Sequence, residues 1–395
     1  MKLRSKLLTV VAVTITGLGV AVVPSFVASA AEACAPAWSA SQVYVGGNVA
    51  SYQSHNYRAK WWSQGDNPAT HSGQWDVWAD QGACGGTTPP PTTPPPTDPP
   101  PSNGTKMPAA PYIYPGWGNP PPPSTVMSAT GIRSFTIAFV LASGCNAVWD
   151  GEGGLTGGAH ASTINAIKAA GGTVIPSFGG WSGNKLGPAC PTAQRLAEQY
   201  QRVIDTFGLR AIDIDIENTD EFQDHTVAGR IVDALKIIKQ NNPGVTTILT
   251  FGTTQSGPNA DGLWLINDVK AKNAVVDIFT QMPFDFGNAG TNMYTATVNA
   301  SEGLKNQLKQ TFGWTDAQAY SHMGISGMNG LSDTGEITTV QNWQDITNYA
   351  KSRNFARLAF WAVNRDRPCP GGGLSSECSS IAQDNWKFTA ISAGF

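Results

Sequence analysis

Apolar residues beyond about residue 107 gather in short runs, and polar or turn-forming residues separate them. Runs with the length and composition of buried strands cover residues 112–115, 134–140, 173–178, 211–216, 246–251, 275–282, 322–326 and 358–362. Apolar positions recur with helical spacing between several of them, as over residues 192–206, 228–240 and 339–353. Repeated strand–helix units over residues 107–395 predict an α/β fold, a (β/α)8 TIM barrel, in which chemistry lies at the C-terminal strand ends.

The run at residues 211–216 carries acids at every second position, Asp213, Asp215 and then Glu217, with isoleucines between them. Side chains alternate faces along a strand, so the carboxylates share one face. A solvated acidic face on an antiparallel edge strand is the alternative, but the neighbouring apolar runs favour an interior parallel strand. Crowded, buried carboxylates cannot all ionise, so their pKa values separate and one becomes a proton donor at neutral pH.

Residues 32–85 predict a small all-β domain, because short polar and apolar stretches alternate with turns. Its aromatic residues exceed what so small a core encloses; they are Trp38, Tyr44, Tyr52, Tyr57, Trp61, Trp62, Trp75 and Trp78. Adjacent Trp61 and Trp62 would face opposite ways in a strand, one inward and one outward. An exposed tryptophan offers an apolar face on which a sugar ring stacks.

The chain begins with a pattern typical of a secretory signal peptide over residues 1–30: basic residues, an apolar run and a small-residue cleavage site. A membrane anchor is the weaker alternative, because Thr, Gly and Pro interrupt the run. Residues 86–106 are rich in Pro and Thr and predict an extended spacer. We therefore expect a soluble, secreted, extracellular protein with two folded units.

Six cysteines fit an oxidising compartment. We favour pairing within local groups, since each pair then stays in one domain, although the sequence leaves the connectivity open: Cys34 with Cys84, Cys145 with Cys190, and Cys369 with Cys378. The scattered histidines predict no metal, and no cofactor is expected. A formal net charge of −3 and 13% charged residues give no sign of a nucleic-acid partner, and we expect a monomer.

The N-terminal unit resembles the carbohydrate-binding modules of families 5 and 12, which occur on bacterial chitinases. The resemblance rests on Trp38, Val43-Tyr44, the run from Tyr57 to Trp62, and Trp75 with Trp78. It implies binding to chitin or a related polysaccharide, with Trp61 and Trp62 as the binding platform.

Residues 107–395 resemble the glycoside hydrolases of family 18, the chitinase family. The resemblance rests on Ser177-Phe178-Gly179-Gly180, Asp213-x-Asp215-x-Glu217, Met282-Pro283-Phe284-Asp285 and Phe360-Trp361, in the right order on successive strands. Two positions depart from the family: Arg210-Ala211 replaces Asp-Gly, and Phe284 replaces a tyrosine that helps hold the acetamido group of the substrate. Asp285, Gln281 or a residue on another strand could compensate for the lost hydroxyl.

The resemblance implies roles for the three acids. Glu217 is the general acid and Asp215 accepts the acetamido N–H, while Asp213 shares a proton with Asp215. The acetamido oxygen of the substrate attacks the anomeric carbon, so the product retains its configuration. Candidate substrate-binding residues are Asp285, Trp361, Gln281, Met282, Phe284, Trp149 and Trp117, with Trp361 under the cleaved sugar.

The short connection between the last two predicted strands predicts an open groove and internal cleavage. The sequence thus favours a secreted, endo-acting chitinase that binds chitin and chito-oligosaccharides. Two alternatives stay open: a non-catalytic chitin-binding lectin, and an endo-β-N-acetylglucosaminidase acting on N-glycans. No Gly-x-Ser-x-Gly motif supports a serine hydrolase.

Overall fold

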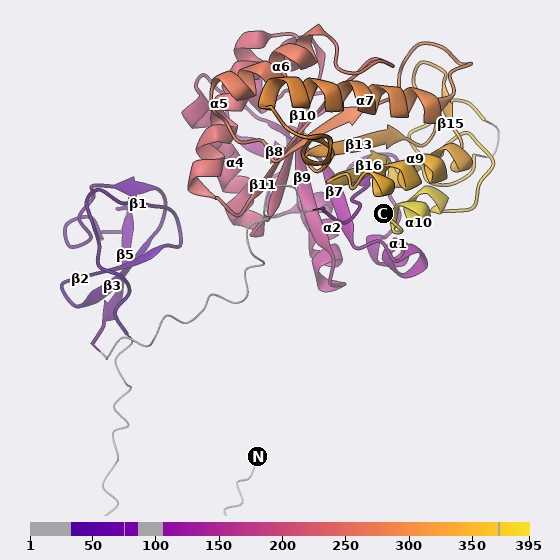
Figure 1. Ribbon diagram of the computed structural model, residues 1–395. Coiled ribbons are helices and arrows are strands. Elements are labelled where there is room, and N and C mark those ends of the chain that lie inside the picture. Colours follow the sequence, from indigo (N-terminus) through magenta and orange to yellow (C-terminus); the bar gives the residue numbers. More distant parts are fainter. Residues whose placement is uncertain (1–32, 75, 86–105, 370–371) are drawn as a thin grey trace, which may run out of the picture. The chain divides into compact units, whose positions relative to one another are not determined.

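The computed structural model describes residues 33–74, 76–85, 106–369 and 372–395 (Figure 1). These residues belong to two compact units, which divide between residues 95 and 96. The expected signal peptide, residues 86–105 of the expected spacer, and Trp75 lie outside the described residues. No helix in the described part of the chain is long and apolar enough to cross a membrane.

The N-terminal unit is a small all-β domain, as predicted. An antiparallel pair and a three-stranded antiparallel sheet make it up: β1 (Val43–Tyr44) with β4 (Ser63–Gln64), and β2 (Val49–Tyr52), β3 (His55–Ala59) and β5 (Trp78–Ala83). Its core contains Tyr44, Ala50, Tyr57, Ala59 and Trp78. The Cys34–Cys84 disulfide joins the two ends of the unit, which stabilises a domain whose core is small.

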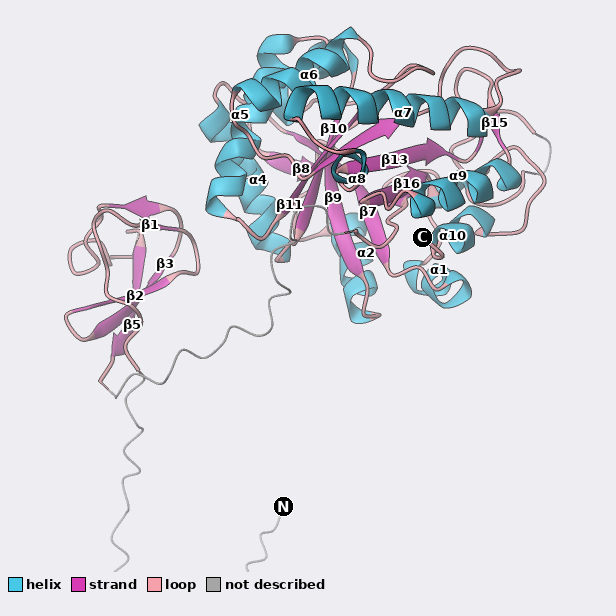
Figure 2. Cartoon of the chain, in the orientation of Figure 1, coloured by secondary structure: helices cyan, strands magenta, loops and turns pink. Residues whose placement is uncertain are grey.

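The C-terminal unit is a nearly closed barrel of parallel strands surrounded by helices (Figure 2). In barrel order the parallel strands are β6 (Tyr112–Ile113), β7 (Ser134–Ala142), β9 (Thr173–Gly179), β10 (Ala211–Ile216), β11 (Thr246–Gly252), β12 (Ile278–Met282), β13 (Met323–Met328) and β16 (Arg357–Trp361). The N–H of Ala110 donates to the carbonyl of Leu358 at 2.9 Å, which brings the first and last strands together. The predicted barrel is confirmed.

The helices and the remaining strands follow the barrel strands along the chain. They are α1 (Pro123–Thr130), β8 (Ala147–Trp149), α2 (Gly158–Ala169), α3 (Leu186–Ala189), α4 (Ala193–Phe207), η1 (Asn218–Phe222), α5 (His225–Asn241), α6 (Ala260–Ala271), α7 (Met293–Phe312), α8 (Asp316–Tyr320), β14 (Gly330–Leu331), β15 (Ile337–Thr338), α9 (Val340–Ser352), η2 (Val363–Arg365) and α10 (Lys387–Ser392). Side-chain caps start several of them: Thr192 accepts from the N–H of Arg195 at α4, and Thr339 forms a capping box with Asn342 at α9.

Strand β10 separates its two kinds of side chain as the alternation predicts. Ile212, Ile214 and Ile216 belong to the large apolar core between the sheet and the helices. Asp213 and Asp215 are 0% and 3% exposed, so the alternative of a solvated acidic face is excluded. Asp213 pairs in register with Ser177 of β9 and Ile248 of β11, which places the acids inside the barrel wall.

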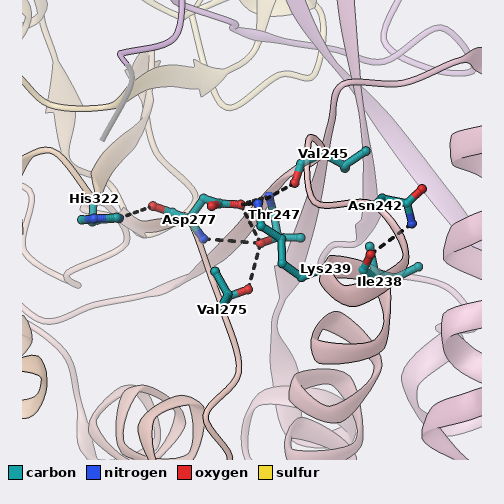
Figure 3. A network of polar contacts seen from close by, with 8 residues as sticks. All are labelled: Ile238, Lys239, Asn242, Val245, Thr247, Val275, Asp277 and His322. Carbon is teal, nitrogen blue, oxygen red and sulfur yellow. Dashed lines mark hydrogen bonds and ion pairs between the residues drawn. The ribbon is translucent and has the colours of Figure 1, made fainter. Parts of the chain in front are cut away.

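A polar network ties together the N-terminal ends of the strands (Figure 3). Asp277, just before β12, accepts from Lys239 at 2.7 Å, and from the N–H and hydroxyl of Thr247 at 2.7 and 3.0 Å. The carbonyl of Asp277 lies 2.7 Å from Nδ1 of His322, just before β13. Helix α5 and three successive strands are therefore joined at this rim. In barrels of this kind, residues at the N-terminal ends of the strands serve stability rather than catalysis.

The three disulfides follow the favoured pairing. Besides Cys34–Cys84, Cys145 pairs with Cys190 and Cys369 pairs with Cys378, and none of the six cysteines is free. Each bridge lies within one of the two units.

Candidate active site

A cavity of about 730 Å³ opens at the C-terminal ends of the barrel strands. Its aromatic lining consists of Tyr112, Tyr114, Trp117, Phe139, Trp181, Phe284 and Trp361. Its acidic lining consists of Asp150, Asp215, Glu217, Asp285 and Asp333. An apolar, aromatic cavity with a few convergent polar groups is the usual form of a ligand site.

Asp213 lies beneath the cavity and accepts hydrogen bonds on both carboxylate oxygens. Its Oδ2 accepts from the hydroxyls of Tyr112 and Ser177 at 2.5 and 2.8 Å. Its Oδ1 accepts from Thr250 at 2.6 Å and lies 3.3 Å from the guanidinium of Arg357, which is fully buried. These donors satisfy the buried carboxylate and stabilise its negative charge.

Asp215 differs from Asp213 because one of its carboxylate oxygens lacks a hydrogen-bond donor in the described part of the chain. Its Oδ1 is buried and has no hydrogen-bond partner among the described residues. Burial raises the pKa of Asp215 well above its ordinary value, and the charges of Glu217 and Asp213 raise it further, against a lowering by Arg357. Burial and the neighbouring acids therefore favour the neutral form of the Asp215 carboxyl.

Glu217 follows β10 directly and lines the cavity. Burial raises its pKa to about 7; the ammonium of Lys185 lowers it, while Asp285 and Asp333 raise it. A group with this pKa is suited to give a proton and take one back near neutral pH.

Two further charged residues lie behind Glu217, and sequence reasoning missed both. Lys185 is 2% exposed; its ammonium lies 2.9 Å from Asp220 and 3.3 Å from the carbonyl of Glu217. Glu221, on the π-helix η1, is 3% exposed, and its Oε2 has no partner in the described part of the chain. Burial raises the pKa of Glu221 to about 8, although Lys185 lowers it. The one sequence signal was the spacing of Glu221 four residues after Glu217, about one helical turn.

Two glycines at the end of β9 let the backbone approach β10. The N–H of Gly180 donates to the carbonyl of Asp215 at 2.8 Å. Gly179 has φ +99°, and a Cβ there would lie 2.3 Å from the same carbonyl oxygen. The Ser-x-Gly-Gly segment therefore shapes this barrel end, and Ser177 supports Asp213.

The substrate-binding candidates that line the cavity are Trp117, Met282, Phe284, Asp285 and Trp361. Trp361 stacks on Phe139 with ring centroids 5.6 Å apart and an interplanar angle of 14°. Trp117, after β6, and Trp181, after β9, are 57% and 70% exposed, so their faces are open to a ligand. The loop inside the Cys369–Cys378 disulfide adds Leu374, Ser375 and Ser376 to the lining.

Two candidates lie elsewhere, and the expectation that they line the groove is wrong. Trp149 is 2% exposed because β8 folds back on β7; its ring stacks on His160 and its Nε1 donates to the carbonyl of Leu155 at 3.2 Å. Gln281 is fully buried, and its amide pairs with Ser301 of α7 at 2.9 Å. Its alternation along β12 turns it toward the helices, so it cannot replace the hydroxyl missing at Phe284.

The N-terminal unit also corrects one expectation. Trp61 and Trp62 are 47% and 51% exposed, so neither is core. They lie in the bend between β3 and β4, where strand alternation does not apply. Both rings are consequently available to a ligand.

The comparisons with known proteins agree with this geometry. The model of carbohydrate-binding module family 5/12 matches residues 37–79. A probable bifunctional chitinase/lysozyme of Escherichia coli K12 is 26% identical over 306 residues, which are 72% of this chain and 34% of that protein. Endochitinase 11 of Metarhizium anisopliae is 27% identical over 251 residues, 60% of this chain and 48% of that protein. The chain thus spans about a third to a half of the length of these curated relatives.

Among solved structures, catalytic-site mutants of active domain 2 of the Pyrococcus furiosus chitinase, complexed with chito-oligosaccharides, superpose with a TM-score of 0.67. The identity is 27%, and the match covers 74% of this chain and 96% of that one. The chain is therefore similar over residues 37–79 to the carbohydrate-binding modules of family 5/12, and over 74% of its length to a chitinase catalytic domain.

Proposed function

We propose that this chain is a secreted, endo-acting chitinase that hydrolyses β-1,4 bonds between N-acetylglucosamine units with retention. The observation that carries the proposal is the row of acids formed by buried Asp213 and Asp215 and half-buried Glu217, of which the last two line an aromatic cavity. The similarity to chitinases, the match to a carbohydrate-binding module and the chito-oligosaccharides bound to the Pyrococcus enzyme support the substrate class.

In the first step Glu217 donates its proton to the glycosidic oxygen as the bond to the anomeric carbon breaks. A pKa of about 7 leaves a large protonated fraction at neutral pH. The acetamido carbonyl oxygen of the same sugar forms the new bond to the anomeric carbon, which gives an oxazolinium ion. In the second step Glu217 takes a proton from water, and the water oxygen forms a bond to the anomeric carbon from the face opposite the oxazolinium oxygen. The bond between that oxygen and the anomeric carbon breaks, which restores the acetamido group.

Asp215 acts on the acetamido nitrogen, which carries positive charge in the intermediate. Its buried Oδ1 is an acceptor site that no described residue fills. Asp213 accepts from three hydroxyls and lies 3.3 Å from the guanidinium of Arg357; it raises the pKa of Asp215 and is the partner with which Asp215 shares a proton. The hydroxyl that Phe284 lacks must come from elsewhere, and Tyr114 and Ser326 both line the cavity.

The short connection between β13 and β16 supports endo action. Only the β14–β15 hairpin and α9 fill that connection, so no additional domain walls the groove at this point. An open groove admits the middle of a polymer. Digestion of a long, end-labelled chito-oligomer should therefore release internal fragments early, and exclusive release of terminal dimers from the outset would contradict endo action.

The N-terminal module serves adsorption to insoluble chitin through Trp61 and Trp62. The double change Trp61→Ala with Trp62→Ala should weaken adsorption to crystalline chitin about tenfold or more, because each ring supplies stacking area. The matched control is Val43→Ala, which removes another exposed apolar side chain of the same module. Turnover of soluble oligomers should be unchanged; equal losses on both substrates would show that the module does not serve adsorption.

The deciding experiment is the anomeric configuration of the first product from an N-acetylated oligomer, followed by NMR with and without a thiazoline inhibitor. Retention and inhibition are expected, and an inverted product would contradict the mechanism. Release of reducing ends from colloidal chitin separates an enzyme from a lectin, and release of N-glycans from a glycoprotein would favour the other alternative. Export and a monomeric state belong to the same proposal.

A further inference from the structure

We propose that Lys185 is a positioning residue that, together with Asp220, holds the backbone of Glu217 and balances the two protonation states of its carboxyl. The inference rests on the proposed function and deepens it, because it names what lets one carboxyl serve as acid and then as base. Nothing in the roles assigned above uses Lys185.

The position of Lys185 is unusual for a lysine. Its side chain is 1% exposed, although it follows a glycine-rich loop after β9. The ammonium has two oxygen partners, the carboxylate of Asp220 at 2.9 Å and the carbonyl of Glu217 at 3.3 Å. Buried charges are retained only when they are paired, so these two contacts fix the ammonium behind the catalytic residue.

The contacts also fix the backbone of Glu217. Its carbonyl stands at the junction of β10 and η1, where the chain leaves the barrel wall. A hydrogen bond from an ammonium group held on the neighbouring loop restrains that junction from the side facing away from the cavity. The side chain of Glu217 is consequently aimed by a residue that touches no substrate.

Among the described residues, Lys185 is the cation that lowers the pKa of Glu217, while Arg365 lines the same cavity and acts on Asp285 and Asp333. The other groups that act on Glu217 are anionic when ionised and come from several elements: Asp215 on β10, Glu221 on η1, Asp285 after β12 and Asp333 after β14. Without a cation, burial and these acids would keep Glu217 protonated, so it could donate a proton but would take one back poorly. Lys185 offsets them, and Asp220 partly neutralises Lys185 in turn.

The test is the pH dependence of kcat/KM on a soluble chito-oligomer for two variants. On the alkaline side kcat/KM falls because Glu217 loses the proton that it must donate. This fall is the alkaline limb of the profile, and its pH therefore follows the pKa of Glu217. Lys185→Met removes a positive charge at similar length, so the limb should move up by about 1 pH unit. Asp220→Asn removes a negative charge and frees that of Lys185, so the limb should move down by about 0.5 pH unit.

The opposite signs distinguish this role from a merely structural one, which would lower activity without displacing the limbs in opposite directions. Asp220 is 45% exposed in its side chain, so Asp220→Asn decides the question even if Lys185→Met fails to fold. The matched control is Lys309→Met, which breaks an ion pair with Asp316 on the outer helices and should leave the profile unmoved.

A second readout does not depend on turnover. A 13C titration of the Glu217 carboxyl, assigned by comparison with Glu217→Gln, should show the same two shifts in the unliganded protein. Unmoved or equally directed shifts would overturn the role of Lys185. An inactive wild-type protein would instead reject the proposed function, and the titration would still decide on Lys185.

Discussion

At the N-terminal rim of the barrel the carboxylate of Asp277 accepts three hydrogen bonds, whereas at the C-terminal rim Asp215 and Glu221 each keep a buried oxygen without a partner in the described part of the chain. The two rims belong to the same sheet. At the first, one oxygen of a half-buried carboxylate is paired with three donors, which stabilises the fold. At the second, burial without pairing raises the pKa values of Asp215 and Glu221.

The difference shows at which rim unpaired acids lower the stability of the fold and provide groups that can transfer protons. A buried acid that is left unpaired costs free energy when it ionises, so it stays protonated and can donate. At the lower rim the carboxylate of Asp277 is instead held by Lys239 and Thr247, and it lies away from the cavity. Changes at the two rims should therefore have opposite consequences for activity and stability.

The largest effect should come from Glu217→Gln at the upper rim. The amide cannot donate or recover the reacting proton, so kcat on chito-oligomers should fall about 1,000-fold or more. Binding of the oligomer, measured by calorimetry, should change little because the shape of the side chain is preserved. Glu198→Gln, at an exposed position on α4, is the control; substantial residual turnover in Glu217→Gln would refute the acid assignment.

A smaller effect, on stability rather than on turnover, should come from Asp277→Asn at the lower rim. The change leaves the half-buried ammonium of Lys239 without its counter-charge, so the free energy of unfolding in urea should fall by about 2–3 kcal/mol. Turnover at 25 °C should stay within about twofold of the wild type, since this rim lies at the far end from the chemistry. A loss of turnover in a folded variant would break the comparison, and Asp345→Asn on α9 serves as the exposed control.

A pH-dependent effect on stability, with the opposite sign, should come from Glu221→Gln. The pKa of Glu221 is about 8 in the folded protein against an ordinary value of 4.5, so folding is favoured fully below pH 4.5 and this contribution is lost as pH rises to about 8. Glutamine does not titrate. The variant should match the wild type at pH 4 and exceed its free energy of unfolding by up to about 4 kcal/mol at pH 8. If the difference in free energy of unfolding between variant and wild type were the same at pH 4 and pH 8, Glu221 would not titrate as described.

Much of the barrel could be predicted from the sequence because its signals are local. The run at residues 211–216 coincides with β10, and alternation alone places Asp213 and Asp215 on one face. Thr192 and Thr339, expected as first residues of helices, are their N-caps. A period of two residues and a cap depend only on near neighbours.

The missed parts depend on contacts between distant segments. Lys185 has the sequence surroundings of a solvent-exposed loop, and only the return of η1 over it makes it buried. Trp149 follows a barrel strand, as a groove residue would, but the β7–β8 hairpin turns it inward. Trp61 and Trp62 were assigned to a strand from composition, and the bend that exposes both depends on the pairing of β1 with β4.

Gly179 carries a consequence for anyone who would redesign this barrel. Because its missing side chain makes room for the Asp215 carbonyl, even alanine would push the acid-bearing strand away from its neighbour. Saturation libraries that aim at new sugar preferences should therefore leave this position untouched and vary Trp117 and Trp181, whose rings are largely exposed.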